Sequence, residues 1–421
     1  MTSSAAAGQG ATTEGELRPL RFHVPEPKCR PGSAPDLSSI ELPTQVLPRP
    51  AIDTPRERLH EYAYGLIRVL GDDHRASGDW APSLDADRLR QGLRSMLLTR
   101  LFDQRMLRAQ RTGKTSFYMQ CTGEEAIAVA QAMALEPNDM CFPSYRQQGL
   151  LVARGWSLVD MMCQVYNNSA DRMKGRQLPV MYSAKEAGFF SISGNLGTQA
   201  IQAVGWAMAS AYKGDTRLAA TWVGDGTTAE ADFHYALTFA AVYRVPVLLN
   251  VVNNQWAISS FQGIAGGEAT TFAARAIGYG LPGLRVDGND FLAVYAATRW
   301  AIARARAGHG ATVLELYTYR AAAHSSSDDP SGYRPDGEAA CWPLGDPIER
   351  LKQHLIALGE WSEERHAALT DELTEVVKVA GKEAESHGTL GRQTPDPRTM
   401  FDDVFKELPE HLLRQREQLG S

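Results

Sequence analysis

Two continuous apolar runs, each ending in a short polar motif, constrain the fold of this 421-residue chain most tightly. The run LAATWV ends at Gly224-Asp225-Gly226, and the run VPVLLNVV ends at Asn253-Asn254. The stretch between them, AEADFHYALTFAAVY, has the composition of a helix. Strand, helix and strand in this order predict a βαβ unit, and runs that are apolar throughout are typical of a parallel sheet covered on both faces.

The same pattern extends on both sides of this unit. Short apolar runs alternate with helical runs from about residue 114 to residue 330, and the strand-like TVLELYTYR follows the helix-like LAVYAATRWAIARARA. Helical periodicity over 56–75 and again over 85–113 predicts two helices ahead of the sheet. We therefore predict an α/β domain over residues 56–345, with a parallel sheet covered by helices on both faces.

The two ends of the chain differ from this middle. Residues 1–55 predict an extended N-terminal arm, because VPEPKCRPGSAPDL carries four prolines, which preclude a long helix. Composition favours disorder for this arm over a segment laid across a partner. Helical periodicity returns after residue 345 and predicts a helical C-terminal extension over 346–421, with Gly359 as a helix stop.

Composition excludes several classes of protein. The net charge of −6 argues against nucleic acid or an anionic membrane as the main partner. The five cysteines are scattered and form no CxxC pair, which predicts reduced thiols and a cytoplasmic location. The N-terminus shows no apolar segment after a basic start, as a secretory signal would, and the apolar runs are too short to cross a bilayer.

Asp225 and Asn254 are the residues that indicate a metal- and phosphate-binding site. They lie 29 positions apart, a separation that returns a βαβ chain to the same edge of the sheet, where α/β proteins bind ligands. Magnesium prefers oxygen ligands, and a carboxylate, an amide oxygen and the backbone carbonyl of Trp256 would supply three. The glycines flanking Asp225 would let phosphates approach the backbone, and a helix from about Thr228 would direct its N–H groups at them.

Three further polar clusters join this pair. His324 lies in AAAHSSSDDPSGYR, after the last predicted strand, where an imidazole can bind phosphate or move a proton; the alternative is a solvated loop. Arg146 lies in FPSYRQQG and suits a diphosphate, with a surface arginine as the alternative. The segment SISGNLGTQ predicts a tight loop that enters a helix near Thr198 or Gln199, or alternatively a simple helix cap.

With these clusters in view, the chain resembles a known family. The pattern GDG, then a helix and a strand, then NN resembles the signature of thiamine-diphosphate enzymes. Over nearly its whole length the sequence resembles the alpha subunit of the branched-chain 2-oxoacid dehydrogenase decarboxylase component, in its bacterial form. Segments that carry the resemblance include FHVPEPKCRPG, SFYMQCTGEEA, SISGNLGTQ, GDGTTAEADFHYALTFA and TYRAAAHSSSDDPSGYR.

The resemblance implies a thiamine-diphosphate-binding fold and a role for each matching residue. Asp225, Asn254 and the Trp256 carbonyl match magnesium ligands, and His324 matches a catalytic, proton-handling position. Leu196 matches the apolar residue under the bent cofactor, while Phe117 and Tyr118 match the wall of the substrate pocket. The positions implied to contact the cofactor are Tyr145, Arg146, Ser193, Gly194, Leu196, Gly224, Asp225, Gly226, Thr227, Asn254 and His324.

Two positions depart from the family. Val252 stands where mammalian relatives have an arginine on the diphosphate, which places a larger share of diphosphate binding on Arg146 and His324. Ser193, Thr198 and Gln199 match a potassium-binding loop of mammalian relatives. Gly194, however, stands where those relatives have a serine, and this argues against potassium here.

The implied reaction is the oxidative decarboxylation of branched-chain 2-oxoacids, with transfer of the acyl group to a lipoyl group on an acyltransferase core. The chain lacks a second α/β domain that would carry the glutamate needed against the pyrimidine ring. We therefore expect a beta subunit and an α2β2 heterotetramer. Alternatives are a pyruvate or acetoin dehydrogenase alpha subunit, a non-catalytic subunit with a vestigial site, and a dinucleotide-binding oxidoreductase, which the absence of GxGxxG disfavours.

Overall fold

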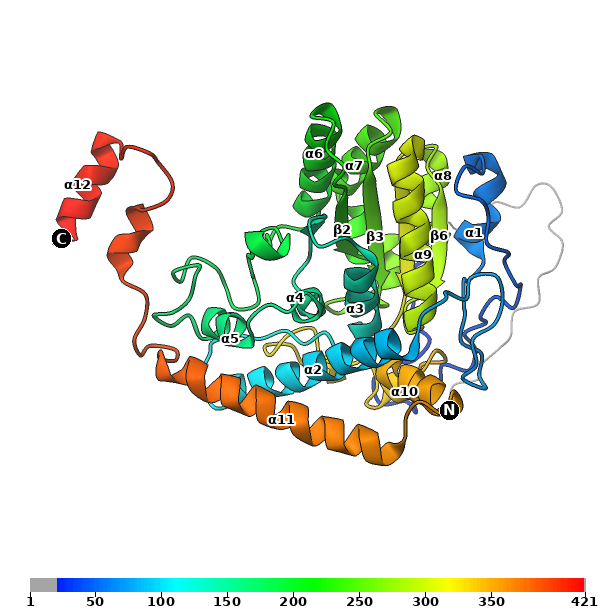
Figure 1. The fold of residues 1–421 in the computed structure, drawn as a ribbon, viewed down its shortest axis with the longest axis horizontal. Helices are drawn as coiled ribbons and strands as arrows, with labels where there is room; N and C mark the ends of the chain where they lie inside the picture. The colour runs from blue at the N-terminus through cyan, green and yellow to red at the C-terminus, as the bar shows by residue number, and fades with distance from the viewer. Residues whose placement is uncertain (1–20, 420–421) are drawn as a thin grey trace.

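A five-stranded parallel sheet forms the centre of the molecule (Figure 1). The computed structural model describes residues 21–419. The strand order is β1-β2-β3-β7-β6, and every neighbouring pair is parallel, which confirms the predicted α/β fold. A small antiparallel pair, β4 and β5, follows β3. The strands are β1 (Met140–Phe142), β2 (Ala219–Gly224), β3 (Val247–Asn253), β4 (Trp256–Ala257), β5 (Ser260–Phe261), β6 (Gly283–Asp287) and β7 (Thr312–Tyr317).

Helices cover both faces of the sheet, as predicted. Alternate residues of β3 enter different apolar clusters: Leu248 and Val252 face one cluster, whereas Leu249 and Val251 face the other. Because side chains alternate along a strand, these clusters are the two sides of the sheet. The first side is covered by α3 (Glu125–Ala134) and α9 (Phe291–Arg304), and the second by α6 (Thr198–Tyr212) and α7 (Ala231–Val242).

Helices α10 and α11 of the C-terminal part pack beside the long helix α2, whereas α12 lies apart from it (Figure 1). Leu351 and Val377 belong to the same apolar cluster as Leu93 of α2, so no separate core forms there. Gly359 has φ +75° at the predicted helix stop. The proposed division at residue 345 remains a prediction. The remaining helices are α1 (Glu61–Tyr64), α2 (Ala86–Arg111), α4 (Gln148–Ala153), α5 (Leu158–Tyr166), α8 (Arg275–Gly278), α10 (Pro347–Ala357), α11 (Glu363–Ser386) and α12 (Glu410–Gln418).

The prediction of a helix over residues 56–75 is wrong for most of this range. A 3-10 turn (Arg56–Leu59) and α1 end at Tyr64, and the chain then becomes extended. Ile67 pairs with Val286 at the sheet edge, and the Asp290 carboxylate accepts hydrogen bonds from the N–H groups that follow. The apolar residues are buried by pairing beside β6, a tertiary contact that overrides local periodicity.

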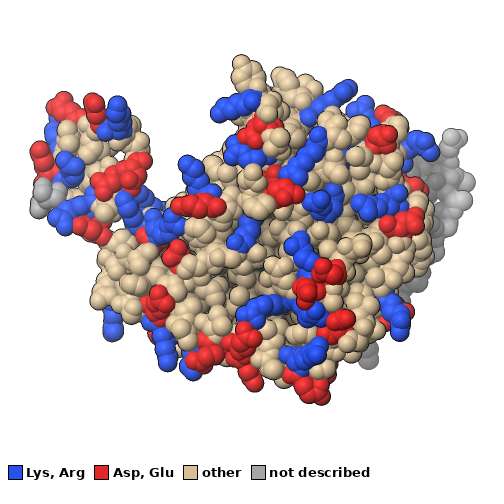
Figure 2. Space-filling model, viewed as in Figure 1, with Lys and Arg blue, Asp and Glu red and all other residues tan. Residues whose placement is uncertain are grey.

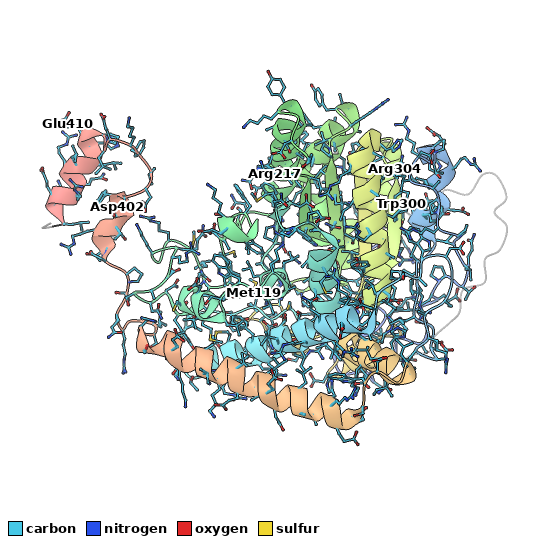
Figure 3. All side chains as sticks on the ribbon, in the orientation of Figure 1. Met119, Arg217, Trp300, Arg304, Asp402 and Glu410 are labelled. Carbon is cyan, nitrogen blue, oxygen red and sulfur yellow. The ribbon has the colours of Figure 1, made fainter. Side chains whose placement is uncertain are left out.

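The described part of the N-terminal arm packs against its own chain. Residues 21–55 contain no helix or strand, yet Cys29, Leu37 and Leu47 are each 4% exposed. Trp300 and Arg304 of α9 donate hydrogen bonds to backbone carbonyls of this arm (Figure 3). The prediction of disorder is therefore wrong for these residues, and residues 1–20 lie outside the described part.

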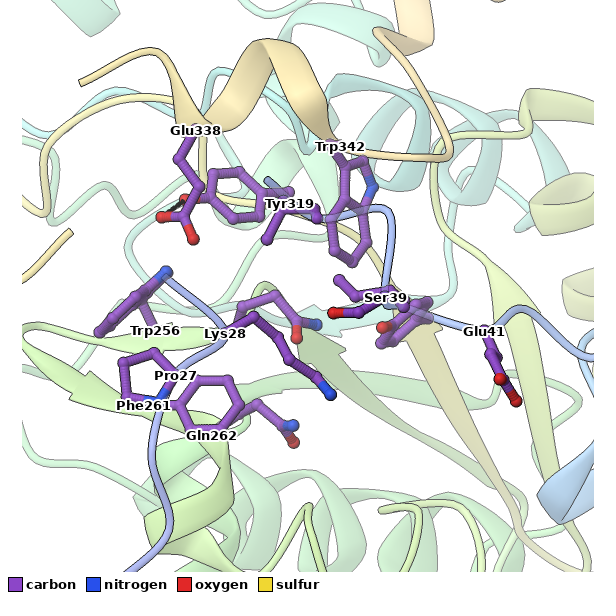
Figure 4. Close-up of a pocket in the computed structure, with 14 residues that line it drawn as sticks. Pro27, Lys28, Ser39, Glu41, Trp256, Phe261, Gln262, Tyr319, Glu338 and Trp342 are labelled. Atoms are coloured by element: carbon purple, nitrogen blue, oxygen red, sulfur yellow. Dashed lines mark hydrogen bonds between the residues drawn. The ribbon is translucent and has the colours of Figure 1, made fainter. Parts of the chain in front are cut away.

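A cavity of about 460 Å³ remains between the arm and the aromatic cluster beneath it (Figure 4). Pro27 and Lys28 of the arm close one side, and Trp342 stands opposite Trp256. This cavity shares Trp256 with the predicted magnesium ligands but contains none of the predicted diphosphate contacts.

The surface mixes both charge signs. On the face drawn in Figure 2, acidic and basic side chains are interspersed rather than gathered in a field of one sign. Asp402 and Glu410 mark a C-terminal segment that lies away from the main body (Figure 3). Within residues 21–419, no helix has the length and apolar character needed to span a membrane.

Candidate cofactor site

Asp225 and Asn254 lie at the carboxyl ends of neighbouring strands, as the spacing predicts. Gly224 at the end of β2 pairs with Val252 of β3, and the Asp225 amide donates to the Val252 carbonyl at 3.2 Å. One detail is wrong: a 3-10 turn over Gly226–Ala229 follows Asp225, and α7 begins only at Ala231 rather than near Thr228. The turn, not the α-helix, therefore presents N–H groups beside the carboxylate.

The Asp225 carboxylate is buried with one oxygen unsatisfied. Its residue is 1% exposed, Oδ1 accepts from the Gly226 amide at 3.0 Å, and Oδ2 has no hydrogen-bond partner among the described residues. Burial raises the pKa of Asp225 to about 7. A buried carboxylate oxygen without a donor is costly unless a cation or a proton compensates it. This oxygen therefore fits a role as a metal ligand.

Asn254 and Trp256 supply the other two predicted oxygens. Asn254 Nδ2 donates to Glu124 Oε1 at 2.6 Å, and Asn254 Oδ1 accepts from the Trp256 amide at 3.3 Å. The Trp256 carbonyl accepts from Arg320 Nη1 at 3.0 Å and keeps its second lone pair. Among the described residues no three histidine, cysteine or acidic side chains converge, so an ion here would rely on mixed oxygen ligands.

The two glycines of the GDG motif lie in different surroundings. A Cβ at Gly226 would lie 2.4 Å from the Ala257 Cβ, so this glycine is required by packing against β4. A Cβ at Gly224 would meet nothing nearer than Thr227 Oγ1, at 3.9 Å. Only Gly224 therefore leaves open space for a ligand, whereas the sequence interpretation gave both glycines that role.

Tyr145, Arg146 and His324 come together beside this edge of the sheet. Arg146 Nη2 donates to the His324 carbonyl at 2.6 Å and meets His324 Nδ1 at 3.1 Å. Because a guanidinium can only donate, Nδ1 is the acceptor, and the proton of a neutral His324 resides on Nε2. Burial, followed by the charge of Arg146, lowers the pKa of His324 to about 3. The Tyr145 ring packs edge-on against the imidazole at 5.8 Å.

Arg146 makes more contacts within the protein than the sequence predicts. Besides His324, it donates to the Gln120 carbonyl, and its Nε lies 3.9 Å from Glu124 Oε1. Several of its N–H groups are thus already engaged, and its first effect is to fix the His324 ring. Glu124 and Arg320 are buried residues of this cluster to which the sequence interpretation gave no role. Glu124 lies in SFYMQCTGEEA, one of the segments that carry the family resemblance.

A narrow cleft of about 30 Å³ joins Arg146 and Glu124 to the loop before α6, whereas His324 and Asp225 do not line it. Tyr145, Leu196, Gly224, Thr227 and Asn254 line it. Leu196 is 47% exposed, so one side of the cleft opens to the surface. This enclosed volume is far below the roughly 300–1,000 Å³ of a complete small-molecule site.

The loop of residues 193–199 has mixed features. Ser193 Oγ accepts from the Asn195 amide at 3.1 Å, and α6 begins at Thr198, as predicted. Gly194 is exposed, and a Cβ there would meet no atom within 4 Å. Gln199 Nε2 donates to the Trp222 carbonyl, while Gln199 Oε1 is buried without a partner. The unpartnered Gln199 oxygen favours a bound cation, but no other group in the described part of this loop supports a cation site.

The two predicted substrate-pocket residues do not line this cleft. Tyr118 is fully buried, and its hydroxyl donates to Asp103 Oδ1 at 2.6 Å, which directs it into the core. Phe117 is half-buried against the core. Their role in a substrate pocket stays a prediction. Asp103 also accepts from the Cys121 amide, so it fixes the backbone that carries the Gln120 carbonyl.

Comparison with known proteins gives one consistent result. A family model described as dehydrogenase E1 component matches residues 93–392, and one described as 2-oxoisovalerate dehydrogenase E1 alpha subunit N terminal matches residues 18–56. The 2-oxoisovalerate dehydrogenase subunit alpha of Pseudomonas aeruginosa is 61% identical, over 96% of this chain and 99% of that protein. The mitochondrial alpha subunit of Mus musculus is 40% identical, over 80% of this chain and 76% of that protein.

Proposed function

The chain belongs to the dehydrogenase E1 component family, among its 2-oxoisovalerate dehydrogenase alpha subunits, and from that premise we propose its function. It binds thiamine diphosphate through magnesium and, with a beta subunit, decarboxylates branched-chain 2-oxoacids. The acyl group passes to the lipoyl group of an acyltransferase core. This reaction belongs to the degradation of valine, leucine and isoleucine.

The unsatisfied carboxylate oxygen of Asp225 is the observation that carries this proposal. Among the described residues no donor reaches the buried Oδ2, and the Asn254 amide oxygen and the Trp256 carbonyl, which follow the neighbouring strand, both retain lone pairs. Hard oxygen ligands in this number suit magnesium, which completes its shell with substrate phosphate and water. A magnesium ion would therefore be held by these three groups.

His324 supports the proposal through its protonation state. When bound, thiamine diphosphate supplies the electron sink for decarboxylation, and the protein supplies orientation and electrostatics. Arg146 holds the imidazole with Nδ1 as acceptor, so Nε2 carries the proton that would be donated to a phosphate oxygen or to a reacting atom. His324 stays neutral at pH 7 in the absence of the cofactor, since its pKa is lowered to about 3.

An incomplete cleft supports the need for a beta subunit. The site encloses little volume in this chain and opens at Leu196. Two helices that begin near it, α6 and α7, expose apolar side chains along their length: Ile201, Tyr212, Tyr235, Phe239, Val242 and Tyr243 are each at least 39% exposed. An exposed apolar surface of this kind is typical of a protein interface. An α2β2 heterotetramer would cover it and complete the site.

The substrate class and the compartment are parts of the same proposal. The match of residues 18–56 to the 2-oxoisovalerate N-terminal model favours branched-chain substrates over pyruvate or acetoin. The five cysteines are free in the described structure, as in proteins of the reducing cytoplasm.

The decisive experiment co-expresses this chain with a beta subunit of the same family and assays lipoyl acylation with 3-methyl-2-oxobutanoate and with pyruvate. We expect activity that depends on both chains, on magnesium and on thiamine diphosphate, with a higher kcat/KM for the branched substrate. Full activity of this chain alone, or a preference for pyruvate, would contradict the proposal.

A further inference from the structure

The orientation of the Asn254 amide decides whether this residue can bind a cation. The two ends of the amide have nearly the same size, but only the oxygen has lone pairs for a metal ion, while the NH₂ group would repel it. Asn254 is 7% exposed, so solvent does little to select one orientation. Some neighbouring group must therefore fix it.

Glu124 is the neighbour that does so. Asn254 Nδ2 donates to Glu124 Oε1 at 2.6 Å, and both side chains are buried. A carboxylate only accepts, so a flipped amide would set oxygen against oxygen. On the other end, Asn254 Oδ1 accepts a longer bond of 3.3 Å from the Trp256 amide. The Glu124 contact is thus the shorter and charge-assisted restraint on the amide.

Glu124 itself is held rigidly. It lies at the N-terminus of α3, after Gly123, which has φ +101° and approaches the Tyr319 carbonyl so closely that a Cβ would lie 2.2 Å away. The Gly123 amide donates to Glu125 Oε2, and Glu125 pairs with Arg100 at 2.8 Å. The turn therefore cannot easily move Glu124 away from the amide.

We propose that Glu124 is a positioning residue that keeps the Asn254 amide oxygen directed to the magnesium ion. This inference rests on the proposed function, because it assigns a role toward the magnesium ion named there. It differs from the simpler view that Glu124 only balances the charge of Arg146, whose Nε lies 3.9 Å away. The two roles predict different results when the acceptor and the charge are removed separately.

The experiment titrates the cofactor-free assembly of this chain and its beta subunit with thiamine diphosphate by calorimetry, at several magnesium concentrations. Glu124→Met removes both the acceptor and the charge, and we expect magnesium affinity to fall about 10–100-fold, as is typical when a partner that orients a metal ligand is lost. Glu124→Gln keeps an acceptor oxygen without the charge, because the donor-only Arg146 side chain favours the amide oxygen at the Oε1 position. Its affinity should stay within about threefold of wild type. Melting temperatures without the cofactor check that each variant folds.

A second background separates orientation from charge. In Asn254→Asp both side-chain oxygens can bind the ion, so orientation no longer matters, and adding Glu124→Met should cause no further loss. Wild-type affinity in Glu124→Met, an equal loss in Glu124→Gln, or the same loss in the Asn254→Asp background would each overturn the inference. Absence of magnesium-dependent binding in the wild-type assembly would instead reject the proposed function, and this inference with it.

Discussion

Replacing Asp225 with asparagine should stabilise the cofactor-free protein and abolish magnesium-dependent cofactor binding. The carboxylate is 1% exposed, and its Oδ2 has no partner within residues 21–419, so its negative charge opposes folding. Burial raises the pKa of Asp225 from 3.8 to about 7. That rise corresponds to roughly 4 kcal/mol of lost stability at pH 8, where the side chain is ionised in both states.

The net gain is smaller, because asparagine brings its own cost. The new NH₂ group would stand where Oδ2 has no donor, and an unsatisfied buried donor costs about 1–3 kcal/mol. The variant should thus be about 1–3 kcal/mol more stable than wild type at pH 8. The stability difference depends on pH. Wild-type stability falls as pH rises from 3.8 toward 7, because the folded state holds the Asp225 proton more tightly than the unfolded state does. The gap should therefore shrink at pH 6.

Chemical denaturation of the cofactor-free assembly at pH 6 and pH 8 measures this difference. The same samples are then titrated with magnesium and thiamine diphosphate. Wild type should gain about 2.7 kcal/mol when ligand is present at a hundred times its Kd, and Asp225→Asn should gain nothing. A variant that is less stable than wild type at pH 8, or that binds the cofactor with unchanged affinity, would refute the reasoning.

Three other outcomes can be measured in the same assembly. His324→Asn should leave the fold intact and remove lipoyl acylation; full activity in that variant would exclude the role of His324. Since the folded pKa of His324 is about 3, wild-type stability should fall as pH drops below 6.5, and the variant should lose about 1 kcal/mol less between pH 7 and 5.5 in denaturation experiments. Gly226→Ala should destabilise the protein by about 1–3 kcal/mol through collision with Ala257, while Gly224→Ala should leave the melting temperature unchanged and weaken cofactor binding. If the two alanine variants had equal effects on stability, packing would not be what distinguishes Gly226 from Gly224.

The central part of the fold is predictable from the sequence because its signals are local and repeated. LAATWV and VPVLLNVV are apolar throughout, and the separation of Asp225 from Asn254 allows one intervening helix. These features alone place both residues at one edge of a parallel sheet, and the strand pairing agrees. The helix predicted over residues 56–75 shows the limit of this reasoning, because its apolar residues are buried by pairing with β6 rather than on a helix face.

The candidate site, like the fold, is only partly predictable from the sequence. The sequence by itself determined that Asp225 and Asn254 lie at the ends of neighbouring parallel strands, since one βαβ unit returns the chain to the same edge of the sheet. Only the tertiary structure decided the hydrogen-bond state of these groups: that Asp225 Oδ2 lacks a donor, that Glu124 holds the Asn254 amide, and that Arg146 sets the tautomer of His324. Glu124 and Arg146 come from chain segments more than a hundred residues from the groups they contact. No local pattern encodes such contacts, because they depend on how distant elements pack.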